Sequence, residues 1–585
     1  MQLTTLDWLL IGLFFTVLLI IGWRVAKRSG SNTKEFFLSG QDMPWWLLGI
    51  SMVATTFSAD TPNLVTDIVR QNGVSGNWVW WAFLLTGMLT VFVYARLWRR
   101  SEVLTDLAFY EMRYSGKAAA FLRGFRAIYL GVFFNVMIMA AVCLAAIKIG
   151  GILFDLKPWE AVVYASVITV LYSSLGGLRG VIFTDFLQFI VAMVGSIWAA
   201  YYIIQMPQIG GLDALLSHAE VVDKLNFLPD FNDRDTLWTL LLIPLAVQWW
   251  SVWYPGAEPG GGGYVAQRML SAKNERHAVG ATLLFNITHY ALRPWPWILI
   301  ALASLILYPE LSDIKAAFPN ATEGHDLGYS AMLTHLPPGL LGLVVSSLIA
   351  AFMSTISTHL NWGSSYIALD FYKRFMRPEA SEKQLVWVGR WSTAVLMLFA
   401  GILALQFESA LDTFNILLQI GAGTGLIFIL RWFWWRINAY SEITGMVVSF
   451  VVALVFEFAA FDLDATEKLL WGVGITTLSW VLVTLITRPT DDDTLRAFYH
   501  KITPYGSGWY GFKKKMKETG RPLEDSNERF TSDLLLFLLG IVLVYAALFG
   551  TGYMLYGETL GAVVLWGIVL LSAWSMNGIF RKRKS

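Results

Sequence analysis

The sequence predicts an all-α polytopic membrane protein with about fifteen transmembrane helices. Of its 585 residues, 56% are hydrophobic and only 15% are charged, whereas about 25% of the residues of a soluble domain are charged. The apolar residues gather in windows of about 20, the length that a helix needs to cross a bilayer. The composition therefore excludes an ordinary soluble protein and indicates a single membrane body surrounded by lipid.

Charge and cysteine content exclude two further classes of protein. The formal net charge is +1 and no long basic or acidic arm occurs, so nucleic acid is not expected as a partner. The single cysteine, Cys143, lies in an apolar run, which leaves neither a disulfide framework nor a cysteine metal site. The sequence indicates no cofactor and no obligate protein partner.

Apolar windows define the expected spans in chain order. They lie near 5–27, 45–71, 76–98, 125–152, 158–177, 181–206, 237–271, 277–307, 338–370, 384–406, 411–433, 438–460, 467–487, 533–556 and 558–578. The first window lacks a small-residue cleavage site and continues into Arg24, Lys27 and Arg28. We therefore expect a retained anchor and not a signal peptide.

The distribution of Lys and Arg predicts the orientation, because basic residues concentrate in cytoplasmic connections. An outside N-terminus places 35 Lys and Arg in the inside segments and 5 in the outside segments. The odd number of spans then brings the basic tail that begins at Arg581 into the cytoplasm. We expect a multi-pass protein of the plasma (cell inner) membrane, with its N-terminus outside and its C-terminus cytoplasmic.

Two expected spans contain residues that interrupt a helix. The second carries small and polar residues at 54–61, and the seventh carries prolines and glycines at 255–263. Irregular backbone survives at membrane depth only where it lines a cavity. The breaks open two five-span blocks, 45–206 and 237–433, and the odd number of spans in each block inverts the second relative to the first. Paired broken helices in inverted repeats indicate the binding site of a secondary transporter.

These observations divide the chain into six parts. They are 1–34 (an extra N-terminal span with its cytoplasmic connection), 35–210 (first five-helix repeat), 211–436 (second five-helix repeat), 437–487 (additional spans), 488–532 (a cytoplasmic linker) and 533–585 (a C-terminal pair of spans and the basic tail). The linker has too few apolar residues for a domain of its own.

The ninth span contains four hydroxyls in five residues, at Ser354, Thr355, Ser357 and Thr358. A hydroxyl in a membrane helix commonly bonds a carbonyl of its own preceding turn, and this alternative stays open for each of them. Together with free carbonyls at the 54–61 break, however, the cluster matches the oxygen ligands that a hard cation such as Na⁺ prefers.

Four further motifs occur in order along 35–433. They are EFFLSG at 35–40, GGLRGVIFTDFLQ at 176–188, QRMLSAKN at 267–274 and DFYK at 370–373. With these motifs the sequence resembles the sodium:solute symporter family, which includes sodium/glucose and sodium/proline cotransporters. The resemblance implies a LeuT-type five-plus-five inverted repeat with one extra helix in front, and solute uptake with Na⁺ as the coupling ion.

The resemblance also implies a sodium site. Its ligands would be the backbone carbonyls of Ala54, Phe57 and Ala351 and the hydroxyls of Ser354 and Thr355. Asp185 matches the family's carboxylate on the cytoplasmic side of that site, where it would help Na⁺ to leave. An ion pair between Asp185 and Arg179 near the membrane interface is the alternative.

Candidates for the solute site lie near the two breaks. They are Asp60, Thr61, Asn77, Glu258, His289 and Arg293. Asp60, Thr61 and Asn77 stand where sugar-transporting relatives carry polar side chains, but the expected acid and amide are missing there. Glu258 is an intramembrane carboxylate and therefore a functional candidate, with a structural pairing to Arg293 as its alternative. His289 falls where a sugar-transporting relative has a basic contact residue, and a structural role is its alternative.

We expect a Na⁺-coupled symporter that imports a small organic solute by alternating access and catalyses no chemistry. A sugar or polyol is favoured, because Asp60 and Glu258 would accept hydroxyl hydrogen bonds and repel an anion. An amino acid or carboxylate is the alternative within the family, since Arg293 and His289 could reverse that preference. A transporter-like membrane sensor is the alternative from another class, and a channel is disfavoured because broken helices build an occluded site.

Overall fold

The computed structural model describes residues 3–29, 33–252, 258–318, 324–407, 418–459, 461–524 and 530–582. Helix accounts for 80% of the structure, and the described residues contain no strand. Met43 and Ala272 form an isolated parallel bridge. The expected all-α fold class is confirmed.

Eleven helical segments within the described ranges are long and apolar enough to cross a membrane. They are Thr5–Gly22, Val74–Ser101, Gly116–Phe154, Gly177–Ile204, Glu275–Leu307, Leu340–Met376, Glu382–Ala404, Ala439–Phe456, Ala465–Ile486, Phe530–Leu555 and Thr559–Lys582. The predicted count of fifteen is therefore not confirmed. The other four predicted spans are broken, short or partly outside the described residues, at 45–71, 158–177, 237–271 and 411–433.

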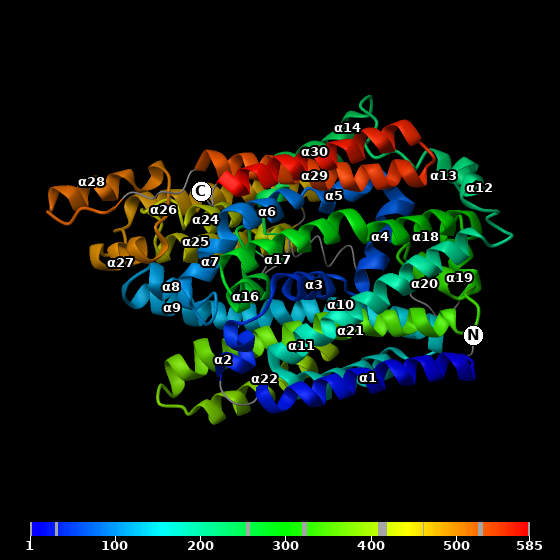
Figure 1. Cartoon of the computed structure of the whole chain (residues 1–585), viewed down its shortest axis with the longest axis horizontal. Coiled ribbons are helices and arrows are strands. Elements are labelled where there is room, and N and C mark those ends of the chain that lie inside the picture. The colour runs from blue at the N-terminus through cyan, green and yellow to red at the C-terminus, as the bar shows by residue number, and fades with distance from the viewer. Residues whose placement is uncertain are drawn as a thin grey trace.

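The elements of the first block and its leading helix follow each other closely along the chain (Figure 1). They are α1 (Thr5–Ser29), α2 (Thr33–Leu38), η1 (Ser39–Gln41), α3 (Trp45–Thr56), α4 (Asp60–Asn72), η2 (Val74–Asn77), α5 (Trp78–Trp81), α6 (Leu84–Leu89), η3 (Thr90–Tyr94), α7 (Ala95–Ser101), α8 (Ala108–Arg113), α9 (Gly116–Ile128), η4 (Tyr129–Phe134), α10 (Asn135–Phe154) and α11 (Pro158–Ile204).

The second block contains three segments that the structure does not describe, 253–257, 319–323 and 408–417. Its elements are α12 (Leu212–Ser217), α13 (Ala219–Val222), α14 (Arg234–Leu237), η5 (Trp238–Leu242), α15 (Ile243–Ala246), η6 (Gln248–Trp250), α16 (Gly263–Ser271), α17 (Glu275–Ile287), η7 (Thr288–Leu292), α18 (Pro294–Leu307), α19 (Leu311–Ala317), α20 (Leu327–Leu333), α21 (Leu340–Ser365), η8 (Tyr366–Met376), α22 (Glu382–Ala404) and α24 (Gly425–Leu430).

The last part of the chain adds further helices outside the two blocks. They are α25 (Ala439–Phe458), α26 (Ala465–Ile486), α27 (Asp492–Ile502), η9 (Ser507–Trp509), α28 (Tyr510–Glu518), α29 (Phe530–Leu555) and α30 (Thr559–Lys582). Figure 1 shows α29 and α30 side by side along one edge, while α1, α11 and α22 lie at the opposite edge.

The break in the second predicted span is present. Helix α3 ends at Thr56, Phe57 has the non-helical angles φ −86° and ψ 74°, and a new helix begins at Asp60. Pro62 lies in the first turn of α4, where its missing N–H breaks no helical hydrogen bond. The last carbonyls of α3 lose their helical donors at this end and become available to other partners.

The two predicted spans at 158–177 and 181–206 meet at a sharp turn within α11. The turn is made by Gly177, whose φ is +53°, a conformation that disfavours residues with a side chain. A Cβ atom at this position would also lie 2.8 Å from the Phe36 carbonyl oxygen. The second half of α11 then packs against α21 and α3, which brings Asp185 into the core.

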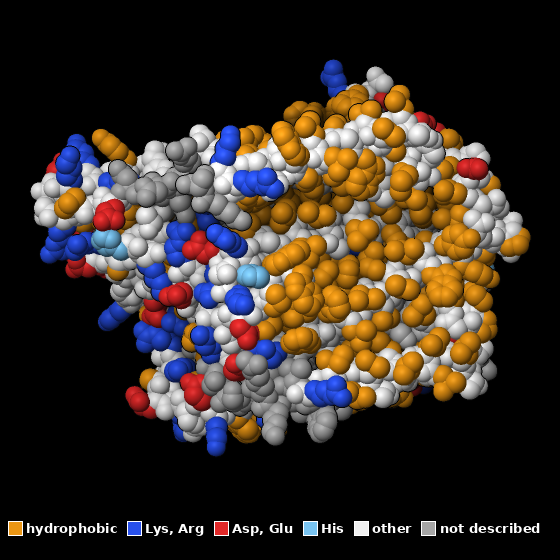
Figure 2. Space-filling model, viewed as in Figure 1, with side chains coloured by type: hydrophobic (Ala, Val, Ile, Leu, Met, Phe, Trp, Pro, Cys, Tyr) orange, Lys and Arg blue, Asp and Glu red, His pale blue; other side chains and the backbone are white. Residues whose placement is uncertain are grey.

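Charged and apolar surfaces are segregated on the molecule. Figure 2 shows a broad apolar surface, whereas Lys and Arg gather at the end where α8, α9, α27 and α28 lie in Figure 1. The N-terminus lies toward the opposite end from this basic surface (Figure 1). This separation of apolar and charged surfaces is typical of a membrane protein.

The segment 488–532 contains more structure than a plain linker. Phe498 of α27 and Phe512 of α28 are buried, and Trp509 donates its Nε1–H to the Trp432 carbonyl oxygen at 2.9 Å. The apolar side of α27 carries only a few residues, but it packs against α7 and α8. The few apolar residues of this segment do not form a separate core. They pack instead against the core of the membrane body.

Candidate functional site

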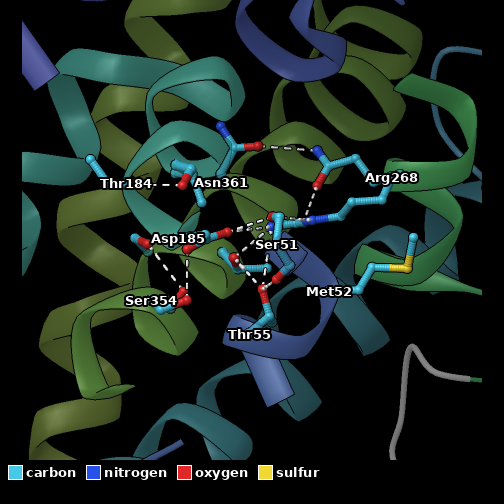
Figure 3. Close-up of polar contacts among 12 residues, drawn as sticks. Ser51, Met52, Thr55, Thr184, Asp185, Arg268, Ser354 and Asn361 are labelled. Atoms are coloured by element: carbon cyan, nitrogen blue, oxygen red, sulfur yellow. Dashed lines mark hydrogen bonds and ion pairs between the residues drawn. The ribbon is translucent and has the colours of Figure 1, made fainter. Parts of the chain in front are cut away.

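The hydroxyl cluster of α21 lies against the broken end of α3. Ser354 donates its hydroxyl to Asp185 Oδ1 at 2.6 Å, and Thr355 donates to the Thr55 carbonyl oxygen at 2.7 Å. Figure 3 shows Ser354, Asp185 and Thr55 converging from three different helices. Both hydroxyls therefore bond residues of other helices. The alternative, a hydrogen bond to a backbone carbonyl of the preceding turn of α21, does not hold for Ser354 and Thr355.

The predicted carbonyl ligands belong to the same region. Ala54 and Phe57 flank Thr55 and Thr56 at the end of α3, and Ala351 lies one turn before Thr355 on α21. All three residues are almost fully buried. Carbonyl and hydroxyl oxygens are suitable ligands for a hard cation, so the chemistry of this set fits Na⁺ as a transported ion.

Asp185 is held by a different arginine from the one considered in the sequence. Its Oδ2 accepts a hydrogen bond from Ser51 at 2.5 Å and lies 3.7 Å from Arg268 Nη2. Arg268 also donates to Thr358 Oγ1 at 2.7 Å. Figure 3 shows the Arg268 side chain reaching toward Ser51 and Asp185. Arg179 instead contacts Asp42 at 2.8 Å. The motif at 267–274 contains Arg268, but the sequence did not indicate that Arg268 pairs with Asp185.

A small cavity lies between the third, seventh and eighth predicted spans. It leaves about 40 Å³ for the centres of water molecules. The residues that line it are Phe83, Thr86, Gly87, Thr90, Glu258, Gly261, Tyr264, Val265, Thr282, Phe285, Asn286, His289 and Tyr290. Glu258 and His289 are therefore brought together, whereas Asp60, Thr61, Asn77 and Arg293 are not among the described residues that line this cavity.

His289 and Arg293 are joined to the end of α3 by Thr56. Arg293 Nη2 lies 3.2 Å from His289 Nε2, and His289 Nδ1 lies 3.0 Å from Thr56 Oγ1. Because a guanidinium only donates, Nε2 must accept and the neutral imidazole carries its proton on Nδ1. Arg293 Nη1 also donates to Thr56 Oγ1 at 3.2 Å. This network fixes the ring that faces the cavity.

The remaining candidates near the first break have different surroundings. Asn77 donates to the Val74 carbonyl oxygen at 2.9 Å and accepts from Trp80 Nε1 at 2.8 Å, which indicates a structural role. Thr61 has a long contact of 3.4 Å to the Thr56 carbonyl oxygen. Asp60 interacts electrostatically with Arg293, and its buried Oδ1 has no hydrogen-bond partner among the described residues.

Glu258 pairs with Arg126 of α9 and not with Arg293. The ion pair joins Arg126 Nη2 to Glu258 Oε1, and each side chain is only 2% exposed. The other oxygen, Oε2, is buried without a hydrogen-bond partner in the described part of the chain, and so is Asn286 Oδ1 in the same cavity. Sequence reasoning missed Arg126 and Asn286, because Arg126 stands at the very start of the apolar window 125–152, where a basic residue is expected near the membrane interface.

Comparison with known proteins supports a common family. The model of the sodium:solute symporter family matches residues 36–449. The chain is 23% identical over 507 residues to the sodium/glucose cotransporter of Vibrio parahaemolyticus, covering 84% of this chain and 92% of the relative. It is 26% identical over 500 residues to a sodium/mannose cotransporter of Bos taurus, covering 78% and 80% respectively.

A solved structure shows the same fold. The structure is a Na⁺-coupled sialic acid symporter in a substrate-bound, outward-open state, with a TM-score of 0.67 and 20% identity. The match covers 84% of this chain and all of that structure. The family match, the fold and the membrane-spanning helices together establish that the chain belongs to the sodium:solute symporter family and is a multi-pass, sodium-coupled symporter.

Proposed function

We propose that the protein imports a neutral, hydroxyl-rich solute, a sugar or polyol, together with Na⁺ by alternating access. The observation that carries this proposal is the chemistry of the cavity between α6, the 258–263 break and α17. Glu258 Oε2 and Asn286 Oδ1 are buried acceptors without partners among the described residues. Buried acceptors are costly unless they receive a hydrogen bond, and solute hydroxyls are suitable donors.

The balance of charge around the site favours a neutral solute. Glu258 is compensated by Arg126, and Asp185 by Arg268. Arg293 is engaged by Thr56 and His289 and interacts with the charge of Asp60. A carboxylate solute would need a cationic group that is free to receive it, whereas these cations already have partners. The aromatic rings of Tyr264 and Tyr290 in the cavity wall suit an apolar sugar face.

The Na⁺ site is proposed at the carbonyls of Ala54, Phe57 and Ala351 and the hydroxyls of Ser354 and Thr355. The burial of both hydroxyls and their position against the last turn of α3 support it. Asp185 is proposed to assist Na⁺ release, because it bonds Ser354 directly and is fully buried beside Arg268.

The finer architecture is also part of the proposal. Fifteen spans, in a LeuT-type pair of inverted five-span repeats at 35–210 and 211–436, would place the N-terminus outside and the C-terminus in the cytoplasm. The broken spans, the fold similarity and the basic surface at one end of the molecule support this arrangement (Figure 2). The plasma membrane is the expected location.

Uptake into proteoliposomes tests the function. Purified protein is given an inward Na⁺ gradient or an equal K⁺ gradient, with labelled glucose, mannose, myo-inositol, proline and succinate as separate solutes. We expect uptake of at least one of the three neutral hydroxylated compounds only with Na⁺. Na⁺-driven uptake of proline or succinate alone would refute the proposed solute class while leaving the symport mechanism intact.

A further inference from the structure

A chain of buried charges extends from the 258–263 break to a helix outside the two five-span blocks. Glu258 pairs with Arg126, Arg126 Nη1 lies 4.0 Å from Glu442 Oε2, and Glu442 Oε2 lies 3.7 Å from Arg431 Nη1. None of these four side chains is more than 3% exposed. Glu442 belongs to α25, so a helix of the C-terminal addition contacts the arginine that pairs with Glu258.

Arg126 is itself firmly oriented. Its guanidinium lies over the Phe428 ring at 4.9 Å and over the Tyr110 ring at 5.2 Å, and Nη1 donates to the Met446 sulfur at 3.5 Å. Aromatic faces hold the plane of an arginine fork and add a cation–π attraction. Glu442 is fixed in turn by the Tyr114 hydroxyl, which donates to its Oε1 at 2.5 Å.

The backbone near Glu258 provides little restraint of its own. Gly260 and Gly261 follow it with φ of +84° and +88°, and α16 begins only at Gly263. A residue in such a segment has few helical hydrogen bonds to hold it in place. The direction of the Glu258 carboxylate therefore depends on its side-chain partner, which is Arg126.

We propose that Arg126 is a positioning residue for solute recognition, and that α25 takes part in the solute site through Glu442. Arg126 binds Glu258 Oε1, while Oε2 of the same carboxylate, whose residue lines the solute cavity, has no hydrogen-bond partner among the described residues. Glu442 Oε2 lies 4.0 Å from Nη1, the other terminal nitrogen of the guanidinium. We therefore expect removal of either Arg126 or Glu442 to let the Glu258 carboxylate turn away. This inference rests on the proposed function, in which Glu258 accepts a hydrogen bond from the solute.

The alternative is an ion pair that stabilises the fold and has no influence on the solute. A double-mutant cycle separates the two roles, because coupled residues give non-additive effects. The variants are Arg126→Gln, Glu258→Gln and the double variant, with Arg126→Lys as the conservative substitution. Arg123→Gln is the matched control, since Arg123 lies on the same helix but pairs with Glu111 and Asp370.

Half-saturation concentrations are measured in proteoliposomes with whichever of labelled glucose, mannose or myo-inositol the parent protein takes up. We expect Arg126→Gln and Glu258→Gln each to raise the solute value about tenfold, and the double variant to raise it no further than Glu258→Gln alone. Arg126→Lys should recover part of the loss. The Na⁺ half-saturation concentration should stay within about twofold, and Arg123→Gln should leave the solute value unchanged.

The outcomes distinguish the two hypotheses. If Glu258→Gln raises the solute half-saturation concentration but neither Arg126 variant does, the positioning role is refuted and the proposed function stands. If Glu258→Gln has no effect, the proposed contact between Glu258 and the solute fails first. Where Arg126→Gln does not accumulate in the membrane, Arg126→Lys and Glu442→Gln decide: unchanged solute values in both refute the inference, and raised values support it.

Discussion

Removal of the Ser354 and Thr355 hydroxyls should weaken the apparent affinity of transport for Na⁺. The double variant Ser354→Ala/Thr355→Val deletes two of the five oxygens proposed for the ion, and valine preserves the shape of threonine. If the two ligands together contribute about 2.8 kcal/mol, the apparent Na⁺ affinity falls roughly a hundredfold. The helix itself should tolerate the change, because neither hydroxyl bonds a carbonyl of its own preceding turn in this structure.

The same substitutions leave two buried acceptors without their donors. Asp185 Oδ1 loses the hydrogen bond from Ser354, and the Thr55 carbonyl oxygen loses that from Thr355. An unsatisfied buried group costs about 1–3 kcal/mol, so protein abundance must be measured beside transport. Ser346→Ala is the matched control, since the Ser346 hydroxyl of α21 donates to the Gly342 carbonyl oxygen of its own helix.

The assay is initial uptake as a function of Na⁺ concentration, normalised to the amount of folded protein in the proteoliposomes. We expect the activation curve of the double variant to move to higher Na⁺ and that of Ser346→Ala to remain in place. A well-folded double variant with the parent's Na⁺ activation curve would show that these hydroxyls are not sodium ligands.

Three further predictions concern topology, the first break and pH. Reporter fusions at 520 and 585 should both show a cytoplasmic location, and a periplasmic signal from either would contradict the orientation. Asn77→Ala should lower protein abundance without changing the solute half-saturation concentration, because Asn77 bonds Val74 and Trp80; a selective loss of solute affinity would instead place it in the site. Burial opposes ionisation of Glu111, but hydrogen bonds from Arg374 and Arg123 lower its pKa below the ordinary value of 4.5. The charged form is therefore stabilised by folding, so Glu111→Gln should reduce thermal stability at neutral pH, and the difference should disappear as the pH falls through the lowered pKa.

The breaks and the hydroxyl cluster could be predicted because they depend on local sequence. Prolines, glycines and a mid-membrane carboxylate mark 54–61 and 255–263, and no packing argument is needed to see that a continuous apolar helix is unfavourable there. The predicted count of fifteen spans is not confirmed by the eleven long apolar helices of the described residues. A broken or short apolar window such as 45–71 reads as one span, whereas the structure divides it into α3 and α4.

The partners of buried charges could not be predicted, because they depend on how distant helices pack. Arg126 and Glu258 are separated by 132 residues, and Asp185 and Arg268 by 83. In each case the sequence offered a nearer arginine, Arg293 or Arg179, and nothing local distinguishes it from the correct one. Desolvation requires that a buried charge has a partner, but it does not say which helix supplies it.

The last turn of α3 links the two halves of the proposed mechanism. Thr55 accepts the hydrogen bond from Thr355 through its carbonyl, and the next residue, Thr56, contacts His289 and Arg293. His289 in turn lines the cavity that contains Glu258. Thr56 lies between Ala54 and Phe57 in the same backbone turn. An ion that draws the carbonyls of Ala54 and Phe57 toward α21 would therefore also shift or immobilise Thr56. Binding of Na⁺ would then be energetically coupled to the shape of the solute cavity. Such coupling is what a symporter needs in order not to transport Na⁺ or the solute without the other.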